Sequence, residues 1–173
     1  MSQVRKGVTM MKGNPLTLLG PEIKIGNKAP SFKVVRNDLS PASLSDFGKQ
    51  IKLISVVPSL DTSVCDLQTR RFNEEAARLG KDVVILTISM DLPFAQARWC
   101  GAAGVNRVVT LSDYQDASFG KAFGVLIKDL RLLNRAIFVL DRQNIVRYVE
   151  YVKENTTLPN FDQALAAVRK LLN

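Results

Sequence analysis

The chain has 173 residues, of which 46% are hydrophobic and 23% are charged, and its formal net charge is +8 at pH 7. This length and composition fit one α/β domain with a sizeable core, and the basic residues occur singly or in pairs instead of in the stripe or patch that nucleic-acid-binding proteins carry. Histidine is absent and the chain has 2 cysteines, which excludes histidine-activated nucleophiles, imidazole metal sites and four-thiolate zinc sites.

The N-terminal residues predict a β-hairpin. Two short apolar segments within residues 8–19 flank Lys12-Gly13-Asn14-Pro15, a sequence typical of a turn. The first segment is cut by Lys12 and is too short for the apolar core of a secretion signal. The longest apolar run, residues 83–90, is far below the ~18 residues that a membrane span needs. We therefore expect a cytoplasmic protein that does not bind membranes.

Strands and helices then alternate along the chain. Apolar runs predict strands at residues 32–35, 51–57, 83–90 and 107–111. Helical segments are predicted at residues 42–47, 62–79, from 91 toward 101–104, and near 114–123. The helix at 62–79 begins after Asp61 or Thr62, both good caps, and stops at Gly80. Asp91 is expected to cap the next helix, with Pro93 in its first turn.

The last part of the chain predicts a second hairpin and a covering helix. Residues 135–140 and 145–152 are candidate strands on either side of Asp141-Arg142-Gln143-Asn144. Residues 160–172 show one apolar stripe, made of Phe161, Leu165, Val168 and Leu172. Strands that alternate with helices imply right-handed crossovers and a mostly parallel centre. The sequence therefore predicts one thioredoxin-like α/β domain over residues 1–173: a central mixed sheet flanked by helices, with an N-terminal β-hairpin extension.

Cys65 falls in the first turn of the predicted helix 62–79, on the stripe that also carries Phe72, Ala76 and Leu79. A free cysteine on such a stripe is most often a small buried apolar side chain. The start of a helix, however, offers unpaired N–H groups and a partial positive charge, and both stabilise a thiolate. Thr62 lies one turn earlier, where its hydroxyl could be aimed at the sulfur. The pattern alone leaves an inert and a reactive Cys65 open.

Three separated segments resemble motifs of the peroxiredoxins, and more narrowly of their thiol peroxidase subgroup. Pro58-Ser59-Leu60-Asp61-Thr62-Ser63-Val64-Cys65 is similar to the subgroup pattern P-S-x-D-T-x-V-C. Phe94-Ala95-Gln96-Ala97-Arg98-Trp99-Cys100-Gly101 resembles the helix that carries the resolving cysteine. Arg135-Ala136-Ile137-Phe138-Val139-Leu140-Asp141 resembles the strand whose leading arginine completes the site. The resemblance runs from about residue 8 to the C-terminus and includes the N-terminal hairpin.

This resemblance implies a role for each matching residue. Cys65 would be the peroxidatic nucleophile and Cys100 the resolving cysteine, joined by an intrachain disulfide. Thr62 would hydrogen-bond the thiolate and the peroxide, Arg135 would supply a cationic donor, and Pro58 would shield the thiolate from water. The family further implies hydrogen peroxide and alkyl or lipid hydroperoxides as substrates, thioredoxin as reductant and a homodimer. No bound metal, nucleotide or other cofactor is expected.

The small rate gain that ionisation of a thiol can supply shows why a donor such as arginine is needed. A free thiol with a pKa of ~8.5 is only a few per cent thiolate near pH 7, so complete ionisation gains at most ~10–30-fold. A thiol of lower pKa is also a weaker nucleophile, with a Brønsted slope of ~0.4–0.5 in thiol–disulfide exchange. Fast attack on a peroxide therefore needs donors that position the O–O bond and stabilise the leaving oxygen. In a chain without histidine, arginine is the natural cation.

Several residues keep an alternative interpretation. Arg131 is a nearby rival to Arg135, but it falls in a predicted loop, whereas Arg135 directly precedes a strand. Thr62 could be only a helix cap and Arg135 only a surface charge. Asp61 is better explained as a cap or fold support than as a catalytic group. Trp99 is better explained by packing than by substrate contact.

Three other functions are considered. A general thiol–disulfide oxidoreductase usually has a C-x-x-C pair, whereas here the cysteines are far apart in sequence. A redox sensor or holdase would use Cys65 only for signalling, and a structural module would leave it inert.

Cys65 begins one predicted helix and Cys100 ends the next. We therefore expect the distance between their Cα atoms to exceed the ~4.4–6.8 Å of a disulfide until residues 63–67 and 99–104 unwind.

Overall fold

A computed structural model describes residues 3–173; residues 1 and 2, which the predicted domain includes, lie outside the described residues. The central sheet has 7 strands: β3 (Lys33–Val35), β4 (Pro41–Ser43), β5 (Ile51–Val56), β6 (Val83–Ser89), β7 (Val109–Ser112), β9 (Ala136–Leu140) and β10 (Val146–Tyr151). Their order is β10-β9-β5-β6-β7-β3-β4. β5, β6 and β7 are parallel, and the other pairs are antiparallel. The predicted mixed sheet with a parallel centre is confirmed.

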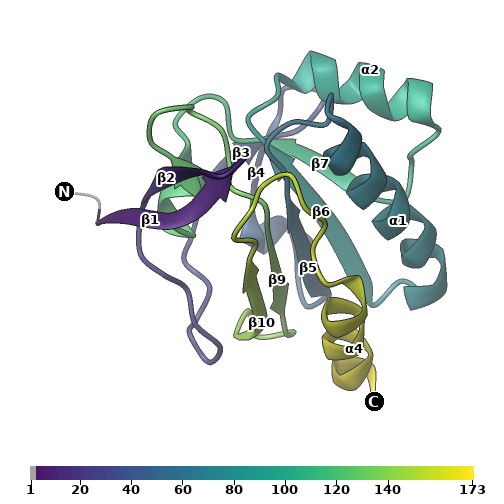
Figure 1. Ribbon diagram of the computed structural model, residues 1–173. Coiled ribbons are helices and arrows are strands. Elements are labelled where there is room, and N and C mark those ends of the chain that lie inside the picture. Colours follow the sequence, from purple (N-terminus) through teal and green to yellow (C-terminus); the bar gives the residue numbers. More distant parts are fainter. Residues whose placement is uncertain (1–2) are drawn as a thin grey trace.

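Helices and loops cover both faces of this sheet. α1 (Ser63–Leu79) and α4 (Phe161–Leu172) lie on one face, as Figure 1 shows, together with the C-terminal part of α2 (Pro93–Ala103). Successive residues of a strand point to opposite faces, so Leu53 packs with α1 and α4, whereas Ile54 packs with α3 (Ser118–Ala122) on the other face. Within residues 3–173, no helix is both long and apolar enough to cross a bilayer.

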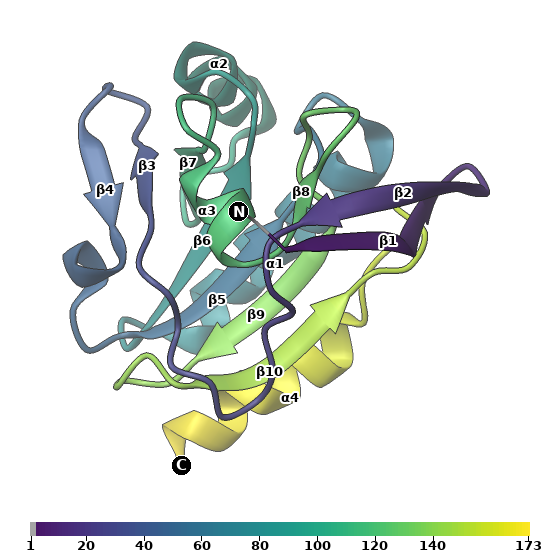
Figure 2. The same ribbon diagram turned by 90° about the vertical axis from the view of Figure 1, so that its left-hand side faces the viewer.

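The N-terminal hairpin forms a second, smaller sheet. β1 (Val4–Met11) pairs antiparallel with β2 (Asn14–Leu19), and β2 pairs with β8 (Leu126–Ile127). Figure 2 shows this hairpin projecting beside the central sheet, next to β8. The predicted hairpin is confirmed, although it begins earlier than expected and its turn is Lys12–Gly13, with Asn14 and Pro15 already inside β2.

Most predicted segments are found, and their boundaries shift by a few residues. The turn expected at 42–47 is the strand β4 followed by a short 3-10 helix, Leu44–Phe47. The strand expected to begin at Arg107 begins at Val109, and the helix expected near 114–123 is only α3. The expected cap of α2 is wrong: Leu92 is the N-cap residue. Asp91 instead uses its carboxylate to hold a neighbouring loop.

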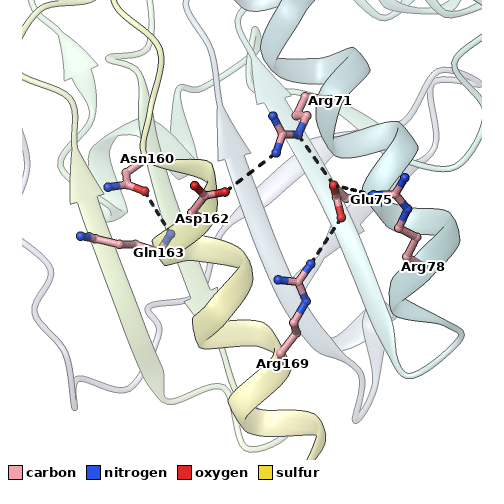
Figure 3. A network of polar contacts seen from close by, with 7 residues as sticks. All are labelled: Arg71, Glu75, Arg78, Asn160, Asp162, Gln163 and Arg169. Carbon is pink, nitrogen blue, oxygen red and sulfur yellow. Dashed lines mark hydrogen bonds and ion pairs between the residues drawn. The ribbon is translucent and has the colours of Figure 1, made fainter.

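A buried carboxylate joins α1 to α4 (Figure 3). Glu75 of α1 is only 5% exposed and lies among three arginines: Arg71 at 3.7 Å, Arg78 at 3.2 Å and, from α4, Arg169 at 3.6 Å. Arg71 also reaches Asp162 at the start of α4, at 3.9 Å. Several cations around one carboxylate offset the cost of burying its charge. The contact holds α4 on the middle and C-terminal part of α1, away from Cys65.

Candidate active site

Cys65 lies in the first turn of α1, directly beyond the end of the central strand β5. The chain leaves β5 at Val56, passes the buried Pro58 and enters α1 with Thr62 as the N-cap residue. The Asp66 N–H donates to the Thr62 carbonyl at 2.9 Å, so the N–H groups of the three preceding residues lack helical acceptors. The Cys65 side chain is 0% exposed. The sulfur therefore sits at the positive end of the helix and is shielded from water.

Arg135 reaches this sulfur from the neighbouring strand. It directly precedes β9, and because β9 runs antiparallel to β5, the start of β9 lies beside the end of β5. The Arg135 Nη2 donates to Cys65 Sγ at 3.3 Å, and Nη1 donates to the Gln68 Oε1 at 2.7 Å. The Asn155 carbonyl oxygen accepts from Nε at 3.2 Å and from Nη2 at 2.8 Å. Arg135, which is 1% exposed, is therefore held on several sides.

The charge of Arg135 has no carboxylate partner. Within the part of the chain that the structure describes, no Asp or Glu lies at ion-pair distance from its guanidinium. A buried cation is costly unless an anion compensates it. The Cys65 sulfur, which accepts from Nη2, is the nucleophilic atom in contact with the guanidinium. A buried cation without a carboxylate partner therefore lies where it can stabilise charge that develops at the reacting sulfur and at a leaving oxygen.

Gln68 belongs to the same cluster, although the sequence did not single it out. It is fully buried three residues after Cys65, on the same side of α1. Its Nε2 donates to the Ser55 hydroxyl at 2.7 Å, which fixes the amide so that its oxygen faces Arg135. The available signal was a polar residue at position i+3 from the cysteine, on the side of the helix that also carries Phe72 and Leu79.

The other predicted site residues occupy different places. Thr62 is exposed, and its hydroxyl donates to the Ser59 carbonyl at 3.1 Å, not to the Cys65 sulfur. Pro58 is buried between β5 and this turn. Arg131 is exposed in a loop with a φ of 58°, and Arg135 is the arginine beside the sulfur. Thr62 lines an open pocket of about 500 Å³ with Leu60, Asp61, Ser63, Asp66, Leu67 and Trp99.

Asp91 fixes the loop that precedes Cys65. Its carboxylate accepts from the Ser59 hydroxyl at 2.7 Å, from the Leu60 N–H at 2.8 Å and from the Ser89 hydroxyl at 2.7 Å. Because Asp91 lies between β6 and α2, it joins the start of α2 to the turn before α1. Sequence reasoning assigned Asp91 to a helix cap and missed this contact.

Cys100 lies near the end of α2 and faces another part of the surface. Its sulfur is 3.7 Å from the Thr110 hydroxyl, and it lines a pocket of about 400 Å³ together with residues 36–38 and 108–110. Burial raises the pKa of the Cys100 thiol, against a smaller opposite effect of the Thr110 hydrogen bond. Both cysteines are free. Cys100 is therefore a protonated thiol here, with its sulfur directed at β7 and not at Arg135.

A polar joint connects the two helices that carry the cysteines. Trp99 packs against the buried cluster that contains Cys65, and its Nε1 donates to Asp66 at 3.2 Å. Arg70 donates to Asp66 at 2.8 Å and to the Ala103 carbonyl at 3.1 Å. Trp99 thus packs as expected, and it also lines the pocket that contains Thr62. These contacts hold α2 against the first turns of α1.

Comparisons with known proteins agree with this arrangement. Residues 24–165 match the family described as Redoxin. The chain is 58% identical over 161 residues to a thiol peroxidase of Halalkalibacterium halodurans and equally to one of Bacillus subtilis, and each comparison covers 93% of this chain and 96% of the relative. The crystal structure of a peroxiredoxin-like protein from Aquifex aeolicus superimposes with a TM-score of 0.88 at 39% identity, covering 95% of this chain and 97% of that chain.

Proposed function

Since this chain belongs to the Redoxin family and, within it, to the thiol peroxidases, we propose that Cys65 is the residue that attacks the peroxide. The enzyme is a peroxiredoxin-type, thiol-dependent peroxidase. One observation carries the assignment of Cys65: its sulfur accepts a hydrogen bond from a buried arginine that has no carboxylate partner within residues 3–173. In the described part of the chain, no arginine or lysine donates to the Cys100 sulfur, which contacts the neutral Thr110 hydroxyl.

The first chemical step consumes the peroxide. The Cys65 thiolate attacks one oxygen of the O–O bond, the bond breaks, and the other oxygen leaves as an alcohol or water after it takes up a proton. The sulfur becomes a sulfenic acid. The Arg135 guanidinium and the unpaired N–H groups at the start of α1 are the donors available to align the peroxide and to stabilise the leaving oxygen. Thr62 lines the pocket through which the substrate would arrive, and a turn of its hydroxyl away from Ser59 would add a further donor.

The second step closes a disulfide. The Cys100 sulfur attacks the Cys65 sulfenic acid, an S–S bond forms and water leaves, so the peroxide has been reduced by two thiols of one chain. Cys100 is protonated while it is buried against Thr110. Local opening of α2 would bring this thiol into water, where its pKa returns toward the ordinary value and the attacking thiolate becomes more abundant.

A dithiol protein must then reduce the disulfide. We assign this step to thioredoxin, and we assign hydrogen peroxide and alkyl or lipid hydroperoxides as substrates, a homodimer as the assembly and the cytoplasm as the location. The support for these assignments is the family and the absence of a helix in residues 3–173 that could cross a membrane.

The disulfide supplies the direct test of the proposed mechanism. Treatment of the reduced protein with one equivalent of peroxide should yield single chains, not linked by a disulfide, whose mass is lower by two hydrogens. Peptide mapping by mass spectrometry should find Cys65 linked to Cys100 of the same chain, and thioredoxin with its reductase should restore both thiols. Interchain dimers alone, or a Cys65 that stays reduced while peroxide is consumed, would contradict the mechanism.

Arg135→Ala should slow the oxidation of Cys65 by peroxide at least tenfold. A hydrogen bond to a charged partner is worth about 1.5–3 kcal/mol, and 1.4 kcal/mol is a factor of ten. The measurement is stopped-flow fluorescence of Trp99, the single tryptophan, which packs against the Cys65 cluster. Arg142→Ala is the matched control because Arg142 is a partly exposed arginine that contacts Asp82 and Lys49, not Cys65. A larger loss in Arg131→Ala than in Arg135→Ala would overturn the choice of arginine.

A further inference from the structure

The segment that follows β10 lies between the N-terminal hairpin and Arg135. The Val152 N–H donates to the Arg135 carbonyl at 3.0 Å, so the segment begins as a neighbour of Arg135. On its other side the Met10 N–H donates to the Lys153 carbonyl at 2.7 Å, and the Asn155 N–H donates to the Met10 carbonyl at 2.9 Å. Residues 152–155 thus connect β1 to the arginine of the candidate active site.

Asn155 touches Arg135 at both of its ends. Its side-chain oxygen accepts from the Arg135 backbone N–H at 2.8 Å, and its own carbonyl oxygen accepts from Nε and Nη2 of the guanidinium. The side-chain nitrogen donates to Asn134 Oδ1 at 2.7 Å, to the Met10 carbonyl at 3.1 Å and to the Thr9 hydroxyl at 3.2 Å. The amide has one orientation, because its oxygen faces an N–H and its nitrogen faces a carbonyl. Because Asn155 is only 2% exposed, water does not replace these partners.

The hairpin holds Asn155 from the opposite side. Thr9 of β1, also 2% exposed, donates to Asn134 Oδ1 at 2.6 Å and lies 3.2 Å from the Val152 carbonyl. Glu154 anchors the hairpin turn, since its two carboxylate oxygens accept from the N–H groups of Lys12 and Gly13, each at 3.0 Å. The backbone hydrogen bond from Gly13, followed by that from Thr156, lowers the pKa of Glu154 to about 2. The carboxylate therefore stays ionised at neutral pH and keeps the hairpin on residues 152–155.

We propose that Asn155 is a positioning residue of this peroxidase, braced by Thr9 of the N-terminal hairpin, and that it holds the Arg135 guanidinium against the Cys65 sulfur. The inference rests on the proposed role of Arg135. An arginine side chain has many rotamers, and a misplacement of about 1 Å at a reacting centre costs on the order of 100-fold in rate. Asn155 removes this freedom because it binds the backbone of Arg135 and two of its guanidinium N–H groups together. The hairpin thereby becomes part of the support of the active site.

The test compares Asn155→Ala with Arg135→Ala and with the double variant. Asn155→Ala keeps the carbonyl oxygen that accepts from the guanidinium but removes the side-chain amide that fixes this carbonyl beside Arg135. The freed guanidinium should lower the rate constant of Cys65 oxidation at least ~10-fold, since a misplacement of about 1 Å costs on the order of 100-fold. Asn155→Ala should also slow the alkylation of Cys65 by iodoacetamide, as should Arg135→Ala. Because Asn155 acts through Arg135, the double variant should react no more slowly than Arg135→Ala alone. A purely structural role of Asn155 would leave the alkylation of Cys65 unchanged, and the losses of the two single variants would add in the double variant.

Asn160→Ala is the matched control. Asn160 belongs to the same C-terminal segment and caps α4 by accepting from the Gln163 N–H at 3.0 Å, without contact to Arg135 (Figure 3). It should lower the melting temperature and leave the rate constant of Cys65 oxidation within about twofold. If Asn155→Ala does not fold, Thr9→Val tests the positioning role in its place. Valine keeps the shape of the side chain and removes the hydroxyl that contacts Asn134 and Asn155. Thr9→Val should slow the oxidation of Cys65 about threefold, as the loss of a neutral hydrogen bond predicts.

The outcomes separate the two proposals. An Arg135→Ala variant with the wild-type rate constant would sink the proposed role of Arg135, whatever Asn155 does. If Arg135→Ala is slow while the Asn155 variant (or Thr9→Val in its place) matches the wild type, only the positioning role fails. The positioning role also fails if the losses of the two single variants add in the double variant.

Discussion

Cys65→Ser is expected to abolish peroxide turnover and leave the protein folded. A serine hydroxyl is not ionised at neutral pH and is a far weaker nucleophile than a thiolate, so the first step has no replacement. The fold should tolerate the change because serine is slightly smaller and its oxygen can accept the hydrogen bond from Arg135 that the sulfur accepts now. Peroxide consumption with thioredoxin and its reductase is the measurement, with far-ultraviolet circular dichroism and thermal melting as checks of the fold.

The effect should be all or none within the range of the assay. Any remaining activity above a few per cent of the wild type would mean that another group attacks the peroxide, and Cys100 would be the first to examine. A variant that consumes no peroxide and has also lost its cooperative thermal transition would not separate chemistry from folding. In that case Cys65→Ala, which asks for no hydrogen bond at all, replaces it and must show the same loss. A redox sensor that does not turn over would fail the assay already as wild type.

Most helices and strands could be predicted because the pattern that indicates each of them lies within one continuous segment of sequence. The strand β5 and the helix α1 follow from an apolar run, a proline, a capping threonine and a terminal glycine, all within one continuous segment. The strand β8 has only 2 residues and exists because it pairs with β2, more than a hundred positions away, so no local pattern could predict it. Asp91 shows a different error. The local pattern predicted a helix cap, but the Asp91 carboxylate binds the Ser59 hydroxyl in the neighbouring loop instead.

The candidate site divides in the same way. Cys65, Thr62 and Arg135 were identified from motifs, and the structure brings Cys65 and Arg135 together because β9 pairs antiparallel with β5. Thr62 shows the limit of a motif, since the motif cannot indicate which acceptor its hydroxyl chooses in a given conformation. Asn155 carried no sequence signal, because its importance arises only when β1 and the segment after β10 meet around Arg135.

The end of α2, which would open in the proposed resolution step, is weakly held. The Asp66–Arg70 pair is solvent-exposed, with side chains 31% and 45% accessible, so it contributes at most about 1 kcal/mol. Gly101 is exposed inside the last turn of α2 and makes this turn easier to unwind by roughly 1 kcal/mol relative to alanine. Gly104 ends the helix as its C-cap residue with a φ of 66°, a conformation that favours glycine. Trp99 makes the main apolar contact of this stretch with α1. Unwinding the end of α2 therefore costs little of the total stability of the domain.

Cys100→Ser isolates the first step from the second. The variant should still consume about one equivalent of peroxide at the wild-type rate constant, because Cys65 and Arg135 are untouched and the Cys100 sulfur contacts the Thr110 hydroxyl, not Arg135. Turnover with thioredoxin should then fall to background, since the Cys65 sulfenic acid has no resolving thiol. Excess peroxide should carry Cys65 on to sulfinic acid, which mass spectrometry detects as two added oxygens.

The comparison with Cys65→Ser makes this outcome decisive. Both variants lose one thiol and both lose turnover, but only Cys100→Ser should show the fast Trp99 fluorescence change and the single equivalent of peroxide consumed. Sustained turnover in Cys100→Ser would mean that thioredoxin, or a second chain, reduces the sulfenic acid directly, and the opening of α2 would then have no part in the cycle. A slow first step in Cys100→Ser would mean instead that the packing of α2 against α1 sets the geometry of Cys65. The contacts of Asp66 with Trp99 and Arg70 would then link the position of α2 to the geometry of Cys65.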